Sequence, residues 1–475
     1  MTPRNSGAQA KPIKVQATDP RKLDRFNPRN RIYVRKSSGQ WTTLRRKMGW
    51  VFMLFFLLLP WLPWGDRPAV LFELAERKFY VFGLVIWPQD LLLLAFLFMI
   101  AAFALFFFTT YLGRVWCGYT CPQTIWTFMF IWVEEKIEGA RNKRIKLDKA
   151  PWSVDKAGKK VAKHGSWLAM SLLTALTFIS FFTPATELYP NFFTGNASGT
   201  VYFWSAFFTL ATYGNAGWMR EIMCLHMCPY ARFQSVMFDK DTYSVGYNAN
   251  RGEQRGPRGR KQNPKEMGLG DCIDCNLCVQ VCPTGIDIRN GLQYECINCG
   301  VCAETCDDVM VKMGYDKGLI SYTTERQLEG GASNVMRPKL VGYGSALLVM
   351  CIAFVAMVGA IKPLEVDVIR DRNMLFRETN EGLIENVYTL KLLNKSEQPV
   401  VFDLAVTGLE EYQWSGLREV AVGAGEVASI PVSVAVDPYY IRDPVTDIDF
   451  VVTAEVGFET VSDHQSSRFI GAGGR

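Results

Sequence analysis

Eight of the thirteen cysteines in this 475-residue chain form two copies of one spacing, and no other feature of the sequence constrains the fold as strongly. The first copy reads C-x2-C-x2-C-x3-C and is followed by Pro283, and the second copy repeats that spacing. In such a run three thiolates surround one [4Fe-4S] cluster, and the fourth crosses to a neighbouring cluster. The expected ligands are Cys272, Cys275, Cys278 and Cys306 for one cluster, and Cys296, Cys299, Cys302 and Cys282 for the other.

Zinc is the main alternative metal, because it also binds four cysteines at C-x2-C spacing. Zinc sites do not need two matched runs of four cysteines, whereas two-cluster ferredoxins do. The second run has Asp307 where the first has Pro283, and this departure removes no ligand. We therefore predict a bacterial-type two-cluster ferredoxin domain with a role in electron transfer.

A second cysteine pattern, C-x3-C-P, also occurs twice. Each copy follows an apolar stretch and precedes an amphipathic one, which indicates an internal repeat. Cysteines at i and i+4 share one face of a helix, and a proline directly after them favours the start of a new helix. If the two repeats pack together, their four thiols converge. The candidate catalytic and metal-binding residues are Cys117, Cys121, Cys224 and Cys228, with Met223, His226 and Met227 as weaker copper-ligand candidates.

Three interpretations of these four cysteines stay open. The first is a copper or redox-thiol site. Thiolates and thioethers prefer soft ions such as Cu(I), and Arg114 and Arg220 are expected to lower the thiol pKa values and keep thiolates available. The second interpretation is a third, membrane-edge metal cluster. The third is that the cysteines are small buried residues at helix ends, as free cysteine often is.

Apolar stretches predict that the chain crosses a membrane, since a spanning helix needs about 20 residues. The expected fold class is a polytopic α-helical membrane protein with about five transmembrane helices. The predicted spans are 47–64, 90–112, 165–184, 200–220 and 339–361.

Glu134 and Glu135, which follow the first C-x3-C-P motif, are expected on the solvent-exposed face of a surface helix.

The distribution of basic residues predicts the orientation in a bacterial inner membrane. Lys and Arg crowd residues 1–47 and 113–163, are sparse in 63–89, and are missing from 185–200. By the positive-inside rule, the N-terminus and the ferredoxin domain are cytoplasmic and the C-terminal tail is periplasmic. The net charge of +6 is modest and the basic residues adjoin apolar runs, so no nucleic-acid partner is expected.

The remaining segments complete the domain division. Residues 246–270 are rich in Gly and Arg and are expected to form a flexible basic linker. The tail carries short, partly alternating β-branched segments separated by turn residues, which predicts a β-sandwich of roughly 100 residues. The expected domains are a basic N-terminal segment 1–46, a membrane domain 47–238, a linker and ferredoxin domain 239–338, a further span 339–361 and a β-sandwich 362–475.

The combined motifs resemble the FixG/RdxA/CcoG family of cytochrome c oxidase accessory proteins. The resemblance rests on the paired C-x3-C-P motifs and on the ferredoxin segments 270–289 and 293–300. It extends into the tail through Arg370-Asp-Arg-Asn373, Leu375-Phe-Arg377 and Ile384-Glu-Asn-Val-Tyr388. The resemblance implies a C-terminal immunoglobulin-like domain, which agrees with the predicted β-sandwich.

The resemblance also implies a function. Members of this family are expected to reduce Cu(II) to Cu(I) for assembly of cbb3-type cytochrome oxidase, with copper chaperones and oxidase subunits or assembly factors as partners. This makes a cupric reductase the main prediction, with two [4Fe-4S] clusters and copper as substrate or bound ion. The alternatives are a quinone- or partner-linked conduit, similar to the ferredoxins of nitrate and nitrous-oxide respiration, or a redox-sensing assembly scaffold. The electron donor, cytoplasmic or quinone, stays open, as does a homo-oligomer.

Overall fold

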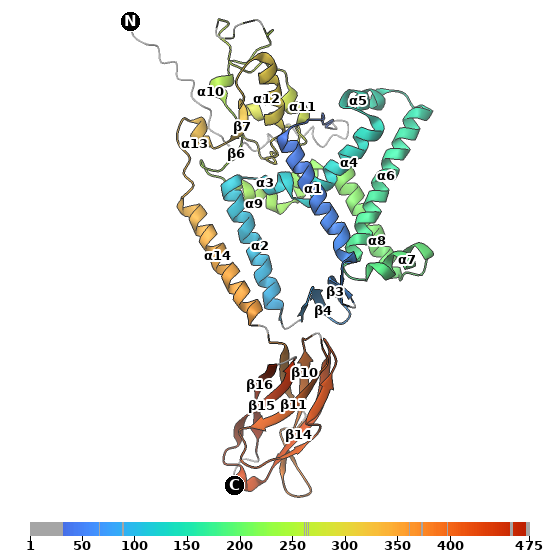
Figure 1. Ribbon diagram of the computed structural model, residues 1–475, viewed down its shortest axis with the longest axis vertical. Coiled ribbons are helices and arrows are strands. Elements are labelled where there is room, and N and C mark those ends of the chain that lie inside the picture. Colours follow the sequence, from blue (N-terminus) through green and yellow to red (C-terminus); the bar gives the residue numbers. More distant parts are fainter. Residues whose placement is uncertain are drawn as a thin grey trace. The chain divides into compact units, whose positions relative to one another are not determined.

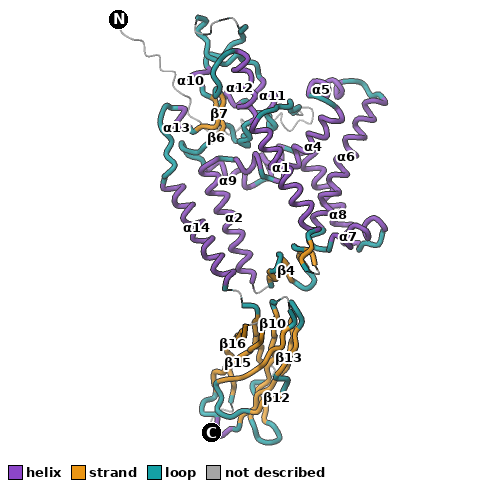
Figure 2. Tube along the Cα trace, in the orientation of Figure 1, coloured by secondary structure: helices purple, strands orange, loops and turns teal. Residues whose placement is uncertain are grey.

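The computed structural model describes residues 32–65, 67–87, 90–260, 262, 264, 266–360, 362–371, 374–396, 398–456 and 459–471. The chain separates into two compact units: residues 1–74 with 92–354, and residues 75–91 with 355–475 (Figure 1). The first unit is mostly helical and the second is built of strands (Figure 2). Of the predicted N-terminal segment 1–46, residues 1–31 lie outside the described residues.

Most helices belong to the first unit, and several begin at residues that favour helix starts. Ser153 and Ser198 each accept a hydrogen bond from a backbone N–H of the first turn, and α4 and α9 each begin with a proline, which is well tolerated at the first position. The α-helices are α1 Gln40–Leu58, α2 Leu91–Leu112, α3 Val115–Tyr119, α4 Pro122–Glu138, α5 Arg141–Lys149, α6 Val154–Ile179, α7 Ala185–Thr194, α8 Gly199–Thr212, α9 Pro229–Met237, α10 Ala249–Gly252, α11 Leu277–Val281, α12 Val301–Met313, α13 Glu325–Leu328 and α14 Pro338–Gly359.

Shorter elements link these helices. Two segments are π-helical, η4 Tyr213–Met219 and η5 Met223–Met227, and two are 3-10 turns, η2 Leu59–Trp61 and η6 Ile288–Asn290. The strands of the first unit are β1 Pro63–Trp64, β2 Arg67–Pro68, β3 Val70–Glu73, β6 Ser244–Tyr247 and β7 Ile320–Thr323.

The prediction of a polytopic protein with about five spans is wrong. Within the described ranges, two helices, α2 and α14, are long and apolar enough to cross a membrane. They correspond to the predicted spans 90–112 and 339–361. The predicted spans 47–64, 165–184 and 200–220 do not form such helices. The fold combines these two apolar helices with a ferredoxin domain and a β-domain.

The three failed spans have physical explanations. The first half of α1 carries Arg45 and Arg46, and the helix ends at Leu58 before Pro60 and Pro63, because proline disrupts a helix interior. The first half of α6 is rich in lysine. The α-helical part of α8 has 14 residues before the chain continues as the π-helical η4, and it rises only about 21 Å, short of the roughly 30 Å hydrocarbon core. Apolar composition alone did not reveal where each helix begins and ends.

The ferredoxin domain is closed by a strand pair. Strands β6 and β7 are antiparallel, with Ser244 opposite Thr323 and Tyr247 opposite Ile320, and α11 and α12 lie between them in sequence. The expected flexible linker 246–270 therefore begins inside a strand, which corrects that prediction for its first residues. The core of this domain contains Val245, Ile286, Ile288, Met310 and Leu319 together with cysteines of both runs.

The predicted β-sandwich forms the second unit. One sheet has the order β12-β14-β10-β8, with β9 beside β10, and the other has the order β13-β11-β15-β16; every pairing is antiparallel. A β4–β5 hairpin adds Val85 and Trp87 against Leu393. The elements are β4 Lys78–Val81, β5 Leu84–Ile86, β8 Leu364–Arg370, β9 Arg377–Glu378, β10 Ile384–Asn394, β11 Val400–Thr407, β12 Gln413–Ser415, β13 Glu419–Val422, β14 Val427–Val436, η7 Pro438–Tyr440, β15 Val445–Val456 and β16 Glu459–Ile470.

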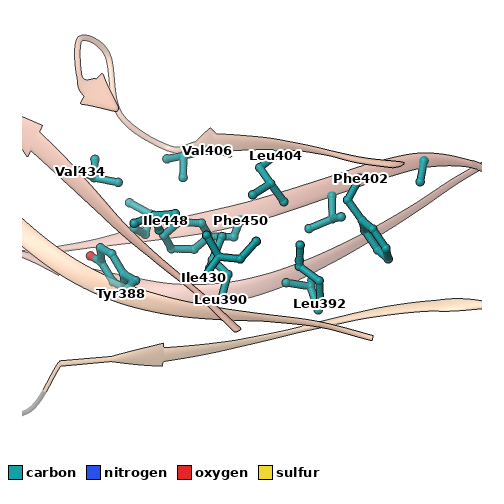
Figure 3. Packing of buried hydrophobic residues seen from close by; sticks show 14 of the residues in the cluster. Tyr388, Leu390, Leu392, Phe402, Leu404, Val406, Ile430, Val434, Ile448 and Phe450 are labelled. Carbon is teal, nitrogen blue, oxygen red and sulfur yellow. The ribbon is translucent and has the colours of Figure 1, made fainter. Parts of the chain in front are cut away.

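Strict alternation places one face of each long strand in the sandwich core (Figure 3). In β11, Phe402, Leu404 and Val406 are buried while the residues between them are exposed, as a period of two requires. The Tyr388 and Phe450 rings meet edge-on with centroids 4.9 Å apart, a favourable aromatic geometry. The core therefore joins the inner faces of both sheets.

Candidate iron–sulfur and thiol sites

The two ferredoxin-type loops have the same backbone curl. Asp274 and Asn276 in the first run have φ of 52° and 55°, and Asn298 and Gly300 in the second have φ of 56° and 73°. Asn, Asp and Gly tolerate this left-handed conformation better than other residues. Because the four residues occupy equivalent positions in the two runs, both loops turn their cysteines inward in the same way.

The eight cysteines come together in two groups of four. Each group lines its own cavity, and in each the fourth thiol belongs to the other run. Buried Ile and Val side chains complete both walls. One cavity is lined by Cys272, Cys275, Cys278 and Cys306. The other is lined by Cys282, Cys296, Cys299 and Cys302, with Cys278 at its edge. These are the two groups that the spacing predicts.

The donor sets fit cubane clusters better than single ions. Within the part of the chain that the structure describes, no three His, Cys, Asp or Glu side chains are close enough to hold one metal ion. A cubane spreads its four thiolates over four irons, so it suits this wider spacing. Burial raises the pKa of Cys278 to about 11 and those of Cys296 and Cys306 to about 12. Metal binding would therefore displace protons from these thiols.

The two C-x3-C-P motifs share one local design. The first cysteine of each pair lies in a short helical turn, Cys117 in α3 and Cys224 in η5. The second, Cys121 or Cys228, is extended and directly precedes α4 or α9. The spacing predicts that the two cysteines of each pair share one face of a single α-helix, and this prediction is wrong. The proline after each motif starts a new helix, so the second cysteine lies outside the first helical turn.

The four thiols of the two motifs lie near one another. Besides burial, the nearby thiols of Cys121, Cys224 and Cys228 raise the pKa of Cys117, although more than one hundred residues separate the two motifs. Burial raises the pKa values of Cys117 and Cys224 to about 12, and Arg114 lowers both only in part. The expected lowering of the thiol pKa is therefore wrong for these two cysteines, since burial outweighs the neighbouring charge.

The three weaker ligand candidates lie beside or within the second motif, and His226 belongs to no group of three His, Cys, Asp or Glu side chains able to hold a metal among the described residues. His226 and Met227 are exposed, and Met223 is partly buried.

Cys117 donates a hydrogen bond from Sγ to Gln234 Oε1 at 3.2 Å. Gln234, a buried residue of α9, was not anticipated from the sequence, because nothing in its spacing marks it.

The first C-x3-C-P motif packs directly on the second ferredoxin loop. Cys117 joins a buried apolar cluster with Ile297, Cys299 and Val301. A Cβ on Gly118 would lie 2.6 Å from the backbone oxygen of Ile297, so only glycine permits this approach. Arg114 is buried and donates hydrogen bonds to the backbone carbonyls of Tyr294 and Ala231. Cys117 and the second cluster cavity are therefore neighbours.

Comparisons with known proteins identify the family. The chain is 35% identical to the nitrogen fixation protein FixG of Rhizobium meliloti, over 93% of this chain and 91% of the relative. It is 38% identical to protein RdxB and 37% identical to protein RdxA of Cereibacter sphaeroides, each over at least 80% of both chains. The chain belongs to the FixG/RdxA family. The resemblance inferred from the motifs is thereby confirmed.

Family models also match individual parts of this FixG-family protein. A "4Fe-4S dicluster domain" covers residues 219–325, a "4Fe-4S binding domain" covers 94–139, and an "IG-like fold at C-terminal of FixG" covers 354–472. A crystal structure of a FixG-related protein from Vibrio parahaemolyticus matches 24% of this chain and 99% of its own, at 38% identity and a TM-score of 0.22. The protein is an iron–sulfur electron-transfer protein of an oxidoreductase family, with an immunoglobulin-like C-terminal domain.

A buried ion network in this FixG-family protein was missed by the sequence prediction. Glu134 is fully buried, not on a wet helix face. Its carboxylate accepts a hydrogen bond from Arg220 at 2.8 Å and lies 3.6 Å from Arg144 and 4.0 Å from Lys163. Arg220 precedes the second C-x3-C-P motif and has φ of 45°. The network therefore ties the helix after the first motif to the turn before the second.

Proposed function

We propose that this protein reduces Cu(II) to Cu(I) at the thiols of Cys117, Cys121, Cys224 and Cys228, for assembly of cbb3-type cytochrome oxidase. When bound, the two [4Fe-4S] clusters supply single electrons. Copper is the substrate and gains one electron. The residues of the chain hold the copper and set its distance from the second ferredoxin loop.

The packing of Cys117 on that loop is the observation that carries the proposal. Cys117 shares a buried cluster with Cys299 and Val301, so one motif thiol adjoins the wall of the second cavity. Thiolate and thioether ligands favour Cu(I) over Cu(II), which favours reduction of an ion bound there. Copper chaperones and oxidase subunits or assembly factors are the proposed partners that receive the product.

Helix α14 separates the ferredoxin domain from the tail in the sequence. If α14 crosses the membrane, the two domains lie on opposite faces. We propose the cytoplasmic face for the ferredoxin domain, because Lys and Arg crowd residues 113–163 and basic loops are retained inside. The immunoglobulin-like domain would then face the periplasm, where it could contact oxidase subunits or assembly factors.

Anaerobic copper reduction by the purified full-length protein tests the proposal. The clusters are first reduced chemically, excess reductant is removed, and Cu(I) is trapped with a chromogenic chelator. The variant with Cys117, Cys121, Cys224 and Cys228 all changed to Ser is compared after its iron content has been measured. We expect the wild type to produce Cu(I) and the variant to lose most of that activity with its ferredoxin iron retained. Equal activities would contradict the proposal.

Two controls sharpen this experiment. Cys351→Ser changes a lone cysteine in α14 and is expected to behave as wild type. Protein with oxidised clusters tests whether the thiols themselves reduce copper, because two thiols can give up two electrons by forming a disulfide. If oxidised protein produces as much Cu(I) as reduced protein, thiol oxidation explains the activity and the proposed role of the clusters is wrong.

A third iron–sulfur cluster at the same four thiols is the second candidate. A "4Fe-4S binding domain" model covers both Cys117 and Cys121, and among the described residues no three His, Cys, Asp or Glu side chains are close enough to hold one ion. Iron and acid-labile sulfide distinguish the candidates. Loss of one cluster's iron in the four-cysteine variant supports a cluster, whereas unchanged iron with lost copper binding supports a copper site.

A further inference from the structure

A cavity of about 340 Å³ lies apart from the cysteine groups, between the chain before α1, helices α1 and α4, and the ferredoxin domain. This volume is within the range of small-molecule sites, roughly 300–1,000 Å³. Its walls include the aromatic residues Trp50, Tyr119, Phe128 and Trp132. No motif in the sequence pointed to it, because its walls come from segments far apart in the chain.

The interior of the cavity offers a hydrogen-bond donor. Arg45 is half-buried, and its guanidinium stacks 3.8 Å above the centroid of the Phe128 ring. Its Nη1 atom is buried and has no hydrogen-bond partner among the described residues. A buried donor without a partner is costly, so an acceptor on a bound molecule would stabilise it. The other cations of the walls, Arg35, Lys36, Arg46 and Lys136, are exposed at the rim.

The cavity shares a wall with the second ferredoxin cavity. Val301 lines both cavities, and Val281, which directly precedes Cys282, also lines this one. Gly118 and Tyr119 extend the same wall from the first C-x3-C-P motif, and the Tyr119 hydroxyl donates a hydrogen bond to the backbone oxygen of Cys299 at 3.2 Å. A molecule in this cavity would therefore lie beside the second cluster site and the thiol site.

An apolar strip continues along α1 from the cavity. Leu54 and Leu58 are exposed and follow the cavity residue Trp50 at intervals of four residues, so these three side chains lie along one side of the helix. An exposed apolar strip of this kind marks a surface that meets lipid or an apolar ligand. The ligand thus has a polar, ring-sized head for the cavity and an apolar tail for the strip.

We propose that this cavity binds the headgroup of a membrane quinone. A quinone ring fits between aromatic walls, its carbonyl oxygen accepts the free hydrogen bond of Arg45, and its isoprenoid tail lies along α1. The ring is a redox-active group, which suits a site that shares a wall with a cluster cavity. The inference does not depend on copper being the substrate.

An anionic phospholipid is the main competing occupant, because five cations and one carboxylate, Glu135, line the cavity. Four of those cations reach water at the rim, where charge interactions are weak. The interior instead presents the Tyr119 and Phe128 rings and the unpartnered Arg45 donor, which suits a neutral carbonyl better than a phosphate. The quinone is therefore favoured.

Photoaffinity labelling of the full-length, iron-loaded protein tests the proposal. The protein is placed in nanodiscs of phosphatidylcholine, and the probe is an azido derivative of a short-chain ubiquinone. We expect labelled peptides that contain Trp50 or Trp132, and competition by unlabelled short-chain ubiquinone. Labelling confined to other segments, or no labelling, would overturn the inference.

Gly49→Leu provides the cavity-filling variant. A Cβ at Gly49 would lie 3.8 Å from Ile125, an ordinary contact, so the new side chain fills the cavity without a backbone clash. We expect labelling to fall about tenfold or more, and Arg45→Met to weaken it severalfold. Gly165→Leu in α6, where an added Cβ meets nothing within 4 Å, is the matched control and should label as wild type.

Iron content reports whether each variant folds, and it is independent of quinone binding. If Gly49→Leu retains its iron and labels as strongly as wild type, the quinone lies elsewhere and the inference is wrong. Nanodiscs that contain phosphatidylglycerol test whether an anionic phospholipid occupies the cavity instead. If that lipid abolishes labelling near Trp50 while unlabelled ubiquinone does not compete, the cavity is a phospholipid site and the quinone assignment fails.

Discussion

Cys282 and Cys306 each end one cysteine run but line the cavity of the other run. This exchange of the last ligand makes the two cluster sites interdependent. A helix, α11 or α12, leads from the third cysteine of each run to the fourth, so the fourth thiol lies about one helical turn beyond its own group. At the residue scale, the exchange predicts which pairs of substitutions damage one cluster and which damage both.

We predict that Cys282→Ser combined with Cys296→Ser removes no more iron than either change alone, because both thiols line the same cavity. Cys282→Ser combined with Cys272→Ser should remove iron from both sites. Iron and acid-labile sulfide in anaerobically purified protein provide the measurement, with Cys351→Ser as the control. The reverse pattern, in which Cys282 and Cys272 behave as one site, would contradict the exchange.

The buried carboxylate of Glu134 gives a second residue-scale prediction. Glu134→Gln should lower the free energy of unfolding by about 3–5 kcal/mol, because it leaves Arg220 buried without its compensating charge. The side chain of Arg220 is 8% exposed and lies 2.8 Å from the Glu134 carboxylate. Thermal and denaturant unfolding of the helical unit provide the measurement.

Glu329→Gln is the matched control for that experiment. Glu329 pairs with Lys240 at 3.5 Å, and both side chains are at least 40% exposed. A surface pair of this kind contributes only about 0–1 kcal/mol. Equal effects of Glu134→Gln and Glu329→Gln would show that the Glu134 network does not hold the two motifs together.

At the scale of elements, one carboxylate joins the two sheets of the immunoglobulin-like domain. Asp463 lies on β16, an edge strand of one sheet, and β8 is the edge strand of the other. Asp463 accepts hydrogen bonds from Lys362 Nζ at 2.7 Å and from the backbone N–H of Val366 at 3.1 Å. Burial alone would raise the pKa of Asp463, but these bonds outweigh burial and hold the pKa below its usual value.

This pKa shift predicts how stability depends on pH. A carboxylate with a lowered folded-state pKa stabilises the domain above its unfolded pKa of about 3.9, and that contribution is lost as the pH falls through the folded value. Asp463→Asn should therefore destabilise the domain at pH 7. The free energy of unfolding of this variant should then fall less than that of the wild type as the pH is lowered from neutral to strongly acidic. Hydrogen exchange of β8 and β16 in the full-length protein, measured across pH, provides the test.

Asp447→Asn is the control for this comparison. Asp447 also lies on an edge-paired strand, but its side chain is 88% exposed beside Arg468. We expect its exchange profile to match wild type at each pH. If Asp463→Asn gives the same acid profile as wild type, the link between β16 and β8 does not contribute to pH-dependent stability.

At the scale of the whole molecule, α2 and α14 are the two described helices able to span a membrane. Arginine near the centre of such a helix costs roughly 2.5–3.5 kcal/mol of insertion free energy. Leu348→Arg with Val349→Arg in α14 should therefore reduce insertion of this helix and change the side on which a C-terminal reporter is found. The same reporter fused to wild type gives the reference.

Leu417→Arg is the matched control, because Leu417 is an exposed apolar residue outside both helices. It should leave the reporter unchanged. An unchanged reporter in the double-arginine variant, with equal protein levels, would contradict a membrane-spanning α14.

The sequence by itself determined the features that depend on local spacing. Three cysteines of each run lie within seven residues of one another, so their convergence needs only a short loop with residues that tolerate positive φ, such as Asn276 and Gly300. The strands of the tail follow from alternation, because a period of two decides which face is buried. The family also followed from the combination of motifs.

The tertiary structure alone decided what depends on contacts between distant segments. The four C-x3-C-P thiols are brought together by tertiary packing, and burial, not the neighbouring arginine, dominates the pKa values of Cys117 and Cys224. Glu134 is buried because its positive partners come from α5, α6 and the turn at Arg220. Apolar stretches overestimated the spans, because hydropathy does not report where a helix stops. Long-range packing determines these outcomes, and no local pattern records it.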